Sequence, residues 1–257
     1  MTYPLPNNAC DLTGQVALVT GASSGLGRRF AQVLAAGGAK VAVTGRRLER
    51  LESLANEIKA AGGDAVPLVL DVTDANQLID VVARAEDALG LVNILVNNAG
   101  IPDAQRAHKM SIELIDKVFD TNLRGPFILS CEVARRLIAA KAPGKMVNIA
   151  STAAFRYAGG GAALYSITKT GMVRLTEALA VEWAANNINV NCIAPGAFSS
   201  EMMDGMLERV GDITQGFPRK RLGDPAQMDS TLLYLVSPAS EFVTGATIRI
   251  DDAQGGR

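Results

Sequence analysis

The sequence predicts an α/β fold with a parallel sheet covered by helices on both faces, and three observations point to it. Short runs rich in Val, Ile and Ala alternate along the chain with longer segments of helical periodicity. Buried parallel strands have this continuous apolar character because helices shield both faces of the sheet. A glycine-rich turn at residues 21–27 directly follows the first apolar run. The chain has 257 residues and no linker-like stretch, which favours one domain over residues 1–257.

Seven strands and five helices are expected in alternation. Each strand is a run of four to six residues dominated by Val, Ile, Leu or Ala, and each helix repeats apolar residues every three or four positions. The strands are expected at 16–20, 40–44, 65–70, 94–97, 145–150, 188–193 and 247–250. The helices are expected at 28–36, 48–61, 75–89, 111–140 and 163–185. Residues 198–218 are weakly patterned and carry Ser, Gly and Met, so we expect a mobile segment that covers a substrate.

The turn at residues 21–27 has the chemistry of a phosphate site. It joins a buried strand to a helix N-terminus, where free backbone N–H groups and the helix dipole attract an anion. The glycines let the backbone turn and approach a pyrophosphate closely, although the spacing differs from the commonest dinucleotide motif. The alternative is a flexible surface turn without a ligand.

The same turn also matches Gly-x-Ser-x-Gly, the nucleophile elbow of hydrolases, with Ser23 as the nucleophile. That class places the elbow after several strands and follows it with an acid and then a His. Here the turn follows the first strand, and the only His, His108, lies mid-chain between basic residues. A hydrolase is therefore disfavoured, and His108 is expected to be a solvated loop residue.

A Tyr and a Lys four residues apart, Tyr165 and Lys169, are the strongest sign of catalytic chemistry. On a helix, positions i and i+4 share a face, so the phenol and the ammonium become neighbours. A nearby cation is expected to pull the pKa of Tyr165 down from about 10, so that the phenol can act as a general acid or base. Ser151 stands upstream, at the end of the strand expected at 145–150.

These features together resemble the short-chain dehydrogenase/reductase family over nearly the whole chain. Residues 20–27 are similar to its cofactor turn, residues 97–100 to the motif that closes its fourth strand, and residues 195–196 to the turn after its sixth strand. The residues that match its catalytic set are Asn122, Ser151, Tyr165 and Lys169. The resemblance implies one Rossmann-type, doubly wound domain with a seven-stranded parallel sheet. Among its members, the chain looks like the 3-oxoacyl-carrier-protein reductase-like carbonyl reductases.

The resemblance implies a role for each catalytic residue. Tyr165 would exchange a proton with the substrate oxygen while hydride passes between nicotinamide and carbonyl carbon. Lys169 would lower the pKa of Tyr165 and bond the nicotinamide ribose, and Ser151 would donate to the developing oxyanion. Asn122 would hold a water that links Lys169 to solvent. From the residues alone it can also be a helix-kink residue, because Gly-Pro follows at 125–126.

The resemblance also implies a set of cofactor contacts, with Ser200 in the place of a residue that contacts the nicotinamide amide. The implied residues are Gly21, Ser23, Ser24, Gly25, Leu26, Gly27, Arg46, Asp71, Val72, Asn98, Ala99, Gly100, Tyr165, Lys169, Pro195, Gly196, Phe198 and Ser200. Asp71 and Val72 match the family's adenine contact, although Asp71 reads equally well as a helix-capping residue.

NADP is expected rather than NAD. An NAD enzyme usually carries an acidic residue at the end of the second strand, where it accepts from the ribose 2′-hydroxyl and repels a 2′-phosphate. This chain has Gly45 and Arg46 there, which leave room and offer a guanidinium fork to the phosphate, and Ser24 can add a hydroxyl. The alternative is that Arg46 and Arg47 merely begin a solvated helix.

The composition excludes several classes. A net charge of −1 offers no footprint for nucleic acid or an acidic membrane, and no apolar stretch approaches the length of a membrane span. The three cysteines show neither a disulfide framework nor a metal pattern, so no metal is expected. Residues 1–8 lack the features of a signal peptide. We expect a soluble, cytoplasmic protein.

The substrate is expected to be a hydrophobic small-molecule ketone or β-keto ester, with an acyl-carrier-protein-linked ketone as the rival. The expected pocket residues, mostly apolar, are Pro102, Ala153, Phe155, Phe198, Met202, Met203 and Met206. A catalytically silent NADP-binding sensor or scaffold is the alternative from another class, which an intact catalytic set disfavours. The family is usually tetrameric, and the resemblance implies a homotetramer through residues 111–140 and 163–185.

Two places depart from the family pattern. The gap between Ser151 and Tyr165 is slightly longer than usual, and the three glycines at 159–161 are the expected site of the extra residue. The end of the chain reads Asp-Asp-Ala-Gln-Gly-Gly at 251–256, where the family commonly has Asp-Gly-Gly. The first departure concerns the pocket wall, and the second concerns the C-terminal subunit contacts.

Overall fold

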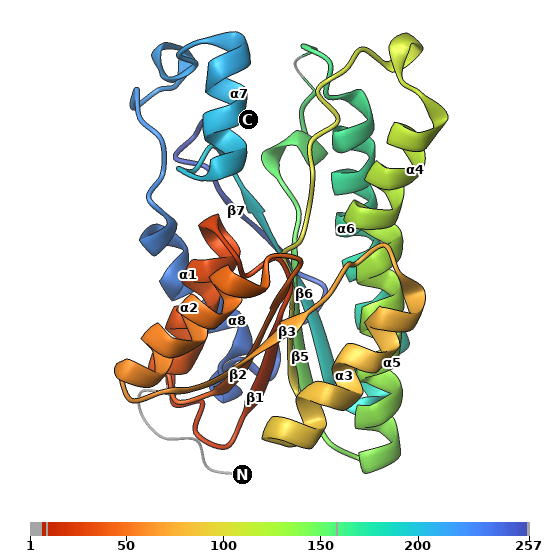
Figure 1. Ribbon diagram of the computed structural model, residues 1–257, viewed down its shortest axis with the longest axis vertical. Helices are drawn as coiled ribbons and strands as arrows, with labels where there is room; N and C mark the ends of the chain where they lie inside the picture. Colours follow the sequence, from red (N-terminus) through yellow and green to blue (C-terminus); the bar gives the residue numbers. More distant parts are fainter. Residues whose placement is uncertain (1–6, 9, 158, 256–257) are drawn as a thin grey trace.

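Seven parallel strands form the central sheet in the order β3-β2-β1-β4-β5-β6-β7 (Figure 1). The computed structural model describes residues 7–8, 10–157 and 159–255, so the segment 1–6 and the expected C-terminal Gly256 lie outside the described residues. The sheet builds outward from β1 to β3 and then from β4 to β7, so the strand order reverses between β1 and β4. The predicted α/β class, the seven parallel strands and the single doubly wound domain are confirmed.

The strands and helices follow the expected alternation. The strands are β1 (Val16–Val19), β2 (Lys40–Gly45), β3 (Asp64–Val69), β4 (Ile94–Asn97), β5 (Gly144–Ile149), β6 (Ile188–Pro195) and β7 (Thr247–Ile250). The α-helices are α1 (Gly25–Ala36), α2 (Leu48–Ala60), α3 (Ala75–Leu89), α4 (Ile112–Phe119), α5 (Gly125–Ala140), α6 (Ala163–Glu182), α7 (Glu201–Val210) and α8 (Asp229–Val236).

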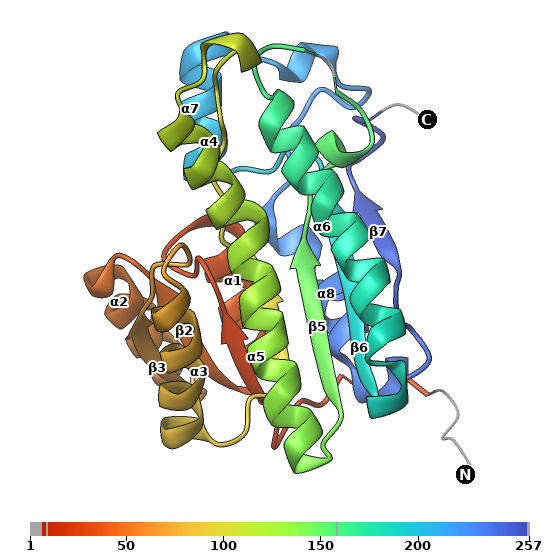
Figure 2. The same ribbon diagram turned by 90° about the vertical axis from the view of Figure 1, so that its right-hand side faces the viewer.

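Successive residues of each strand face two separate apolar cores. In β1, Val16 and Leu18 pack into one core, while Ala17 and Val19 pack into the other. Helices α3, α5 and α6 cover the first face of the sheet, and α1, α2 and α8 cover the second (Figures 1 and 2). Because both faces of the central strands are buried, these strands are largely apolar, as the sequence indicates, and the buried polar exceptions include Asn97, Asn148 and Asn191.

The helix expected over 111–140 is interrupted. A π-helical turn, Asp120–Arg124, separates α4 from α5. Gly125 begins α5 and lies directly against the backbone carbonyl of Val72, where a Cβ would not fit. Such π turns are frequent at functional sites, and this one carries Asn122 on its buried side. The helix expected over 111–140 is therefore present from Ile112 to Ala140, with a π turn at Asn122 that the sequence did not indicate. The alternative that Asn122 marks a kink stays a prediction.

Two helices between β6 and β7 were not expected from the sequence. The segment 198–218, expected to be weakly patterned and mobile, contains α7. This helix is continuous, includes Gly205 and is rich in Met. The sequence of α8 contains a short apolar run that resembles a strand. A 3₁₀ turn, Pro225–Met228, precedes the helix and is stabilised by a capping box of Asp224 and Gln227. Both helices are short, so propensity alone says little about them.

The carboxyl ends of the strands carry the loops that form the site. Figure 1 shows α7 on one side of this edge and α4 on the other, beyond the tips of the strands. The reversal of strand order between β1 and β4 opens the sheet at the same edge, and ligands of open α/β sheets bind at such a point.

Candidate active site

A cavity of about 1140 Å³ lies at the carboxyl edge of the sheet and collects nearly all the residues singled out from the sequence. Of the expected cofactor residues, every one except Gly27 lines it. Three of the four expected catalytic residues line it too, namely Ser151, Tyr165 and Lys169. Asn122 lies behind the wall, 1% exposed. Residues spread over most of the chain therefore converge on one space.

The glycine turn at residues 21–27 is shaped by its glycines. Gly21 and Gly25 have φ of +67° and +54°, which disfavours any other residue. Gly27 does not face the cavity, because a Cβ there would overlap the Asn98 side chain and the Gly21 carbonyl. It is therefore a packing glycine, and its expected cofactor contact is not supported. Ser24, the N-cap of α1, makes no side-chain capping bond, so the first N–H groups of the helix are free for an anion.

Arg46 and Arg47 follow β2 and line the cavity, and Arg47 makes hydrogen bonds to the glycine turn. The Arg47 guanidinium donates to the hydroxyls of Ser23 at 2.9 Å and Ser24 at 3.0 Å. It also pairs with Glu201 at 3.0 Å, and Arg50 pairs with the same carboxylate. Hydrogen bonds from these arginines, of which the bond from Arg50 has the largest effect, lower the pKa of Glu201 to about 2. Arg46 lines the cavity as expected, but the sequence did not single out Arg47 or Glu201.

Asp71 and Val72, the residues expected to contact adenine, both line the cavity. Asp71 accepts from the N–H and hydroxyl of Thr73, at 3.0 Å and 2.9 Å, so it shapes the turn after β3. The cap of α3 is Asp74, which accepts from the N–H groups of Asn76 and Gln77. Asp71 is therefore not the helix cap, and its place in the cavity wall remains available for a ligand.

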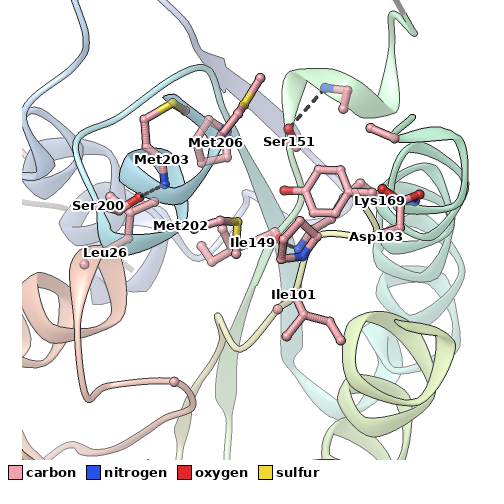
Figure 3. Close-up of a pocket in the computed structure, with 18 of the residues that line it drawn as sticks. Leu26, Ile101, Asp103, Ile149, Ser151, Lys169, Ser200, Met202, Met203 and Met206 are labelled. Atoms are coloured by element: carbon pink, nitrogen blue, oxygen red, sulfur yellow. Dashed lines mark hydrogen bonds between the residues drawn. The ribbon is translucent and has the colours of Figure 1, made fainter. Parts of the chain in front are cut away.

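Tyr165 and Lys169 lie as the helical spacing predicts, but the electrostatic result differs. The Lys169 Nζ atom is 5.6 Å from the centre of the Tyr165 ring and donates to the Ile149 carbonyl at 2.8 Å (Figure 3). Burial raises the pKa of Tyr165 above its usual value, and a hydrogen bond with Ser151 only partly opposes this rise. Burial also lowers the pKa of Lys169 to about 8. The pKa of Tyr165 is thus raised and not lowered as expected, because desolvation of the buried phenol is the largest influence on it.

Ser151 ends the segment after β5 and faces the phenol. Its hydroxyl accepts from the Ala153 N–H at 3.1 Å, which caps a short 3₁₀ turn, Thr152–Ala154, and orients the side chain (Figure 3). The same hydroxyl lowers the pKa of Tyr165 through a hydrogen bond. Ser151 is thus fixed by its own turn beside the acidic proton.

Asn122 brackets the loop after β4. Its Oδ1 accepts from the Ile101 N–H at 2.8 Å, and its Nδ2 donates to the Ile101 carbonyl at 2.9 Å and to Thr168 at 3.2 Å. A Cβ on Gly100 would lie 3.3 Å from Lys169 Nζ and 3.5 Å from Asn122 Oδ1. Because Gly100 has no side chain, the Lys169 ammonium and the Asn122 amide can both lie close to its backbone.

The remaining cofactor residues follow β6. The Ser200 hydroxyl accepts from the Met203 N–H at 3.2 Å and caps α7 (Figure 3). A Cβ on Gly25 would lie 3.2 Å from the Ser200 Cβ, so the start of α7 sits over the glycine turn. Gly196 packs against the C-terminal turn, where Gln254 lines the cavity and accepts from the Ala197 N–H at 2.7 Å. The divergent C-terminal sequence thus supports the site.

The substrate side of the cavity is largely as expected. Pro102, Ala153, Phe198 and the Met side chains of α7 line it. Phe155 does not, because its half-exposed ring stacks instead against Arg249 at 5.2 Å. The expectation for Phe155 is therefore wrong. The glycines at 159–161 all have positive φ and form part of the wall.

The hydrolase alternative loses its structural basis. His108 is exposed in a short 3₁₀ turn and does not line the cavity, so Ser23 has no His beside it as a hydrolase would require. Among the described residues, no group of three or more His, Cys, Asp or Glu could hold a metal ion, and the three cysteines are free. In the part of the chain that the structure describes, no helix is long and apolar enough to cross a bilayer.

One further acidic residue, Asp103, was not singled out from the sequence. It lines the cavity and accepts from the Tyr165 N–H at 3.0 Å. A signal was present, because the helix that carries Tyr165 begins after Ala162, which cannot cap it.

Comparison with known proteins agrees with the geometry. The model of the short chain dehydrogenase family matches residues 15–210. Gluconate 5-dehydrogenase from Gluconobacter oxydans is 36% identical over 243 residues, which cover 93% of this chain and 94% of that protein. The 3-oxoacyl-acyl-carrier-protein reductase of Thermotoga maritima is 34% identical over 241 residues, covering 93% and 97%. The crystal structure of a variant actinorhodin polyketide ketoreductase with NADPH has a TM-score of 0.90 and 32% identity, covering 95% of this chain and 98% of that one.

Proposed function

The chain belongs to the short-chain dehydrogenase/reductase family, and from this premise we propose that it is an NADP(H)-dependent carbonyl reductase with Tyr165 as general acid and base. Members of this family are oxidoreductases that act on alcohol and keto groups. The observation that carries the proposal is that Tyr165, Lys169 and Ser151 share one cavity with a glycine turn built for a phosphate.

The cavity fits a dinucleotide with a 2′-phosphate. The uncapped N-terminus of α1 and the glycine turn would hold the pyrophosphate. Arg46 and Arg47 line the far end, where their guanidinium groups would bind the 2′-phosphate, and no carboxylate of β2 opposes it. The related ketoreductase with NADPH supports this choice of cofactor. NADP(H) supplies or accepts the hydride when it is bound.

The residues of the chain supply the proton. Burial keeps the Tyr165 phenol protonated at neutral pH, because its pKa is raised, so it is ready to donate to a carbonyl oxygen. Ser151 donates to the same oxygen as negative charge develops on it. Lys169, whose pKa is about 8 and whose Nζ lies 5.6 Å from the centre of the Tyr165 ring, would bond the ribose of the cofactor. Asn122 and Lys169 both lie close to Gly100, and a water held by Asn122 would connect the ammonium to solvent.

The substrate side favours an apolar ketone. Met202, Met203 and Met206 of α7 present adaptable side chains to the cavity (Figure 3). The segment 198–218 would close over a ketone or β-keto ester. A 3-oxoacyl-acyl-carrier-protein reductase is the second candidate, which the Thermotoga relative favours. A binding protein without activity would have no use for the protonated phenol and its Ser151 partner.

A Tyr165→Phe variant tests the proposal. It removes the acidic proton but keeps the ring, so turnover should fall by at least about a hundredfold, the lower end of general acid catalysis. The measurement is NADPH oxidation with a panel that contains ethyl acetoacetate, an aryl ketone and an acetoacetyl thioester. The same panel decides between the free ketone and the carrier-linked candidate.

Cofactor binding by the Tyr165→Phe variant is the control. NADPH fluorescence titration should give a dissociation constant within a few-fold of the wild-type value, since the glycine turn and the arginines are unchanged. A variant that keeps half of the wild-type turnover would contradict the role of Tyr165. A wild-type protein that binds NADPH and reduces nothing in the panel would favour the sensor or scaffold.

A further inference from the structure

Asp103 is a buried carboxylate in the wall of the cavity, and no step of the proposed function uses it. It is 4% exposed, and buried carboxylates are rare unless a partner compensates the charge. Among the described residues it forms no ion pair. Instead its Oδ1 accepts from the Ala104 N–H at 2.7 Å and its Oδ2 from the Tyr165 N–H at 3.0 Å. Two backbone donors, one of them on the catalytic tyrosine, therefore compensate the carboxylate.

The contact with Tyr165 caps the catalytic helix from another part of the chain. Helix α6 begins at Ala163, and its N-cap residue, Ala162, has no side chain that could accept a hydrogen bond. The Tyr165 N–H is the third in the helix, one of the donors that an N-cap side chain normally satisfies. Asp103 fills this role from 62 residues earlier, and its charge lies at the positive end of the helix dipole.

The loop that carries Asp103 is itself held rigidly. Asn122 clamps Ile101 through two hydrogen bonds, two residues before Asp103. Ala104 has a φ of +50°, an unfavourable conformation for a residue other than Gly, and its N–H is bonded to Asp103. The loop thus joins the π-helical turn to the N-terminus of α6, and Asp103 is the link at the second end (Figure 3).

The charge of Asp103 also acts on the phenol. It raises the pKa of Tyr165, in the same direction as burial, while the Ser151 hydrogen bond acts the other way. On α6 itself the neighbouring charge is Lys169, and behind it on β6 lies Cys192, whose pKa burial raises to about 11. Other charged groups line the cavity wall, namely Arg46 and Arg47 after β2, Asp71 after β3, Lys117 and Asp120 around α4, Arg156 after β5, and Glu201 and Arg209 on α7. Of all these groups, Asp103 alone combines a carboxylate with a direct bond to the Tyr165 backbone.

We propose that Asp103 is a positioning residue for Tyr165, which anchors the backbone of the tyrosine at the start of α6 and places a negative charge at the N-terminus of the helix that carries the phenol. The proposal rests on the proposed function, in which Tyr165 is the acid. It assigns Asp103 two separable effects, one through its hydrogen bond and one through its charge.

Two substitutions separate these effects. Asp103→Asn keeps an oxygen that can accept the Tyr165 N–H but removes the charge, whereas Asp103→Ala removes both. Since a carboxylate disfavours phenolate, loss of the charge should move ionisation of Tyr165 to lower pH in both variants. The measurement is the near-ultraviolet phenolate absorbance during a pH titration, with the same titration of the matching Tyr165→Phe double variant subtracted. Asp116→Asn, an exposed carboxylate on α4, is the control and should leave the titration unchanged.

Loss of the hydrogen bond between Asp103 and the Tyr165 N–H should lower the turnover rate. With ethyl acetoacetate and NADPH, Asp103→Ala should lower kcat by roughly tenfold or more, since small misplacements of a catalytic group are costly, and Asp103→Asn should lower it less. KM for NADPH should stay unchanged in both. If Asp103→Ala does not fold, the titration of Asp103→Asn still decides the matter.

Three results would overturn the proposal. An unmoved Tyr165 titration in Asp103→Asn would leave only a structural cap. A raised KM for ethyl acetoacetate with unchanged kcat would make Asp103 a substrate contact. A fall in melting temperature without any change in the Tyr165 titration would likewise show that Asp103 is only a structural cap. The proposed function fails separately, if Tyr165→Phe remains active.

Discussion

In the proposed function, Gly45 and the arginines that follow it determine which cofactor the site accepts. A Cβ added to Gly45 would lie 3.7 Å from Leu51 and from the Ser23 hydroxyl, an ordinary contact distance, and its backbone is extended. A side chain therefore fits at this position without strain. The sequence pointed to Arg46 as the phosphate ligand, and the structure adds Arg47, which already bonds the two serines of the turn.

A Gly45→Asp variant should turn the preference from NADPH toward NADH. The new carboxylate would repel the 2′-phosphate and accept from a free 2′-hydroxyl. Loss of one charge-assisted hydrogen bond, roughly 1.5–3 kcal/mol, corresponds to at least about tenfold in selectivity. The measurement is the ratio of kcat/KM with the two cofactors. Gly45→Ala is the matched control and should keep the wild-type ratio. A wild-type enzyme that already prefers NADH would refute the assignment.

Helix α7 is tied to the cofactor end of the cavity through a single side chain. Glu201 in its first turn pairs with Arg47 and Arg50 across the mouth of the cavity. Its pKa of about 2 lies below the usual value, so this pairing is complete at neutral pH and is lost only as pH falls toward 2. The carboxylate occupies the same guanidinium that would bind the 2′-phosphate. Under the proposed function, helix α7 and the 2′-phosphate of the cofactor would therefore compete for Arg47.

A Glu201→Gln variant should bind NADPH more tightly while its affinity for NADH stays unchanged. Arg47 becomes free for the phosphate, and a repulsive charge disappears. Because Glu201 is half-exposed, the gain should be about two- to fivefold, in line with roughly 0.4–1 kcal/mol for an exposed ion pair. Dissociation constants from cofactor fluorescence measure it. Glu208→Gln, on the same helix and exposed, is the control. An equal gain for NADH would show that the competition does not exist.

On the scale of the whole molecule, α4 to α6 leave apolar side chains on the surface. Ile112, Phe127, Ile167 and Val181 are each about half exposed or more, up to 81% for Val181. Exposed apolar groups that gather on one face commonly mark protein interfaces. We propose that the chain forms a homotetramer through α5 and α6, as the family resemblance implies.

Sedimentation equilibrium tests the assembly. The wild-type protein should have about four times the chain mass of 26.9 kDa, and Ile167→Glu should reduce that mass because a charge would be buried at the interface. Leu48→Glu places the same charge on α2, which covers the opposite face of the sheet, and should leave the mass unchanged. A monomeric wild-type protein would contradict the proposal.

The sequence by itself determined the strands, the parallel sheet and most of the site. Strands buried on both faces are largely apolar, so β1, β2 and β4 are visible in the sequence as apolar runs. The glycine turn and the Tyr165–Lys169 pair are local patterns, readable because the i, i+4 spacing and the positive φ at Gly21 and Gly25 depend only on neighbouring residues.

Only the tertiary structure decided the features that depend on distant residues. Whether Lys169 or burial controls the pKa of Tyr165 depends on how deeply the packed chain encloses the phenol, and burial prevails. Phe155 contacts Arg249 and does not line the cavity, and α7 and α8 form where the sequence indicated an irregular stretch. Asp103 caps a helix that starts 60 residues farther along the chain, a pairing that no local pattern encodes, because a hydrogen bond depends on distance in space and not on separation in sequence.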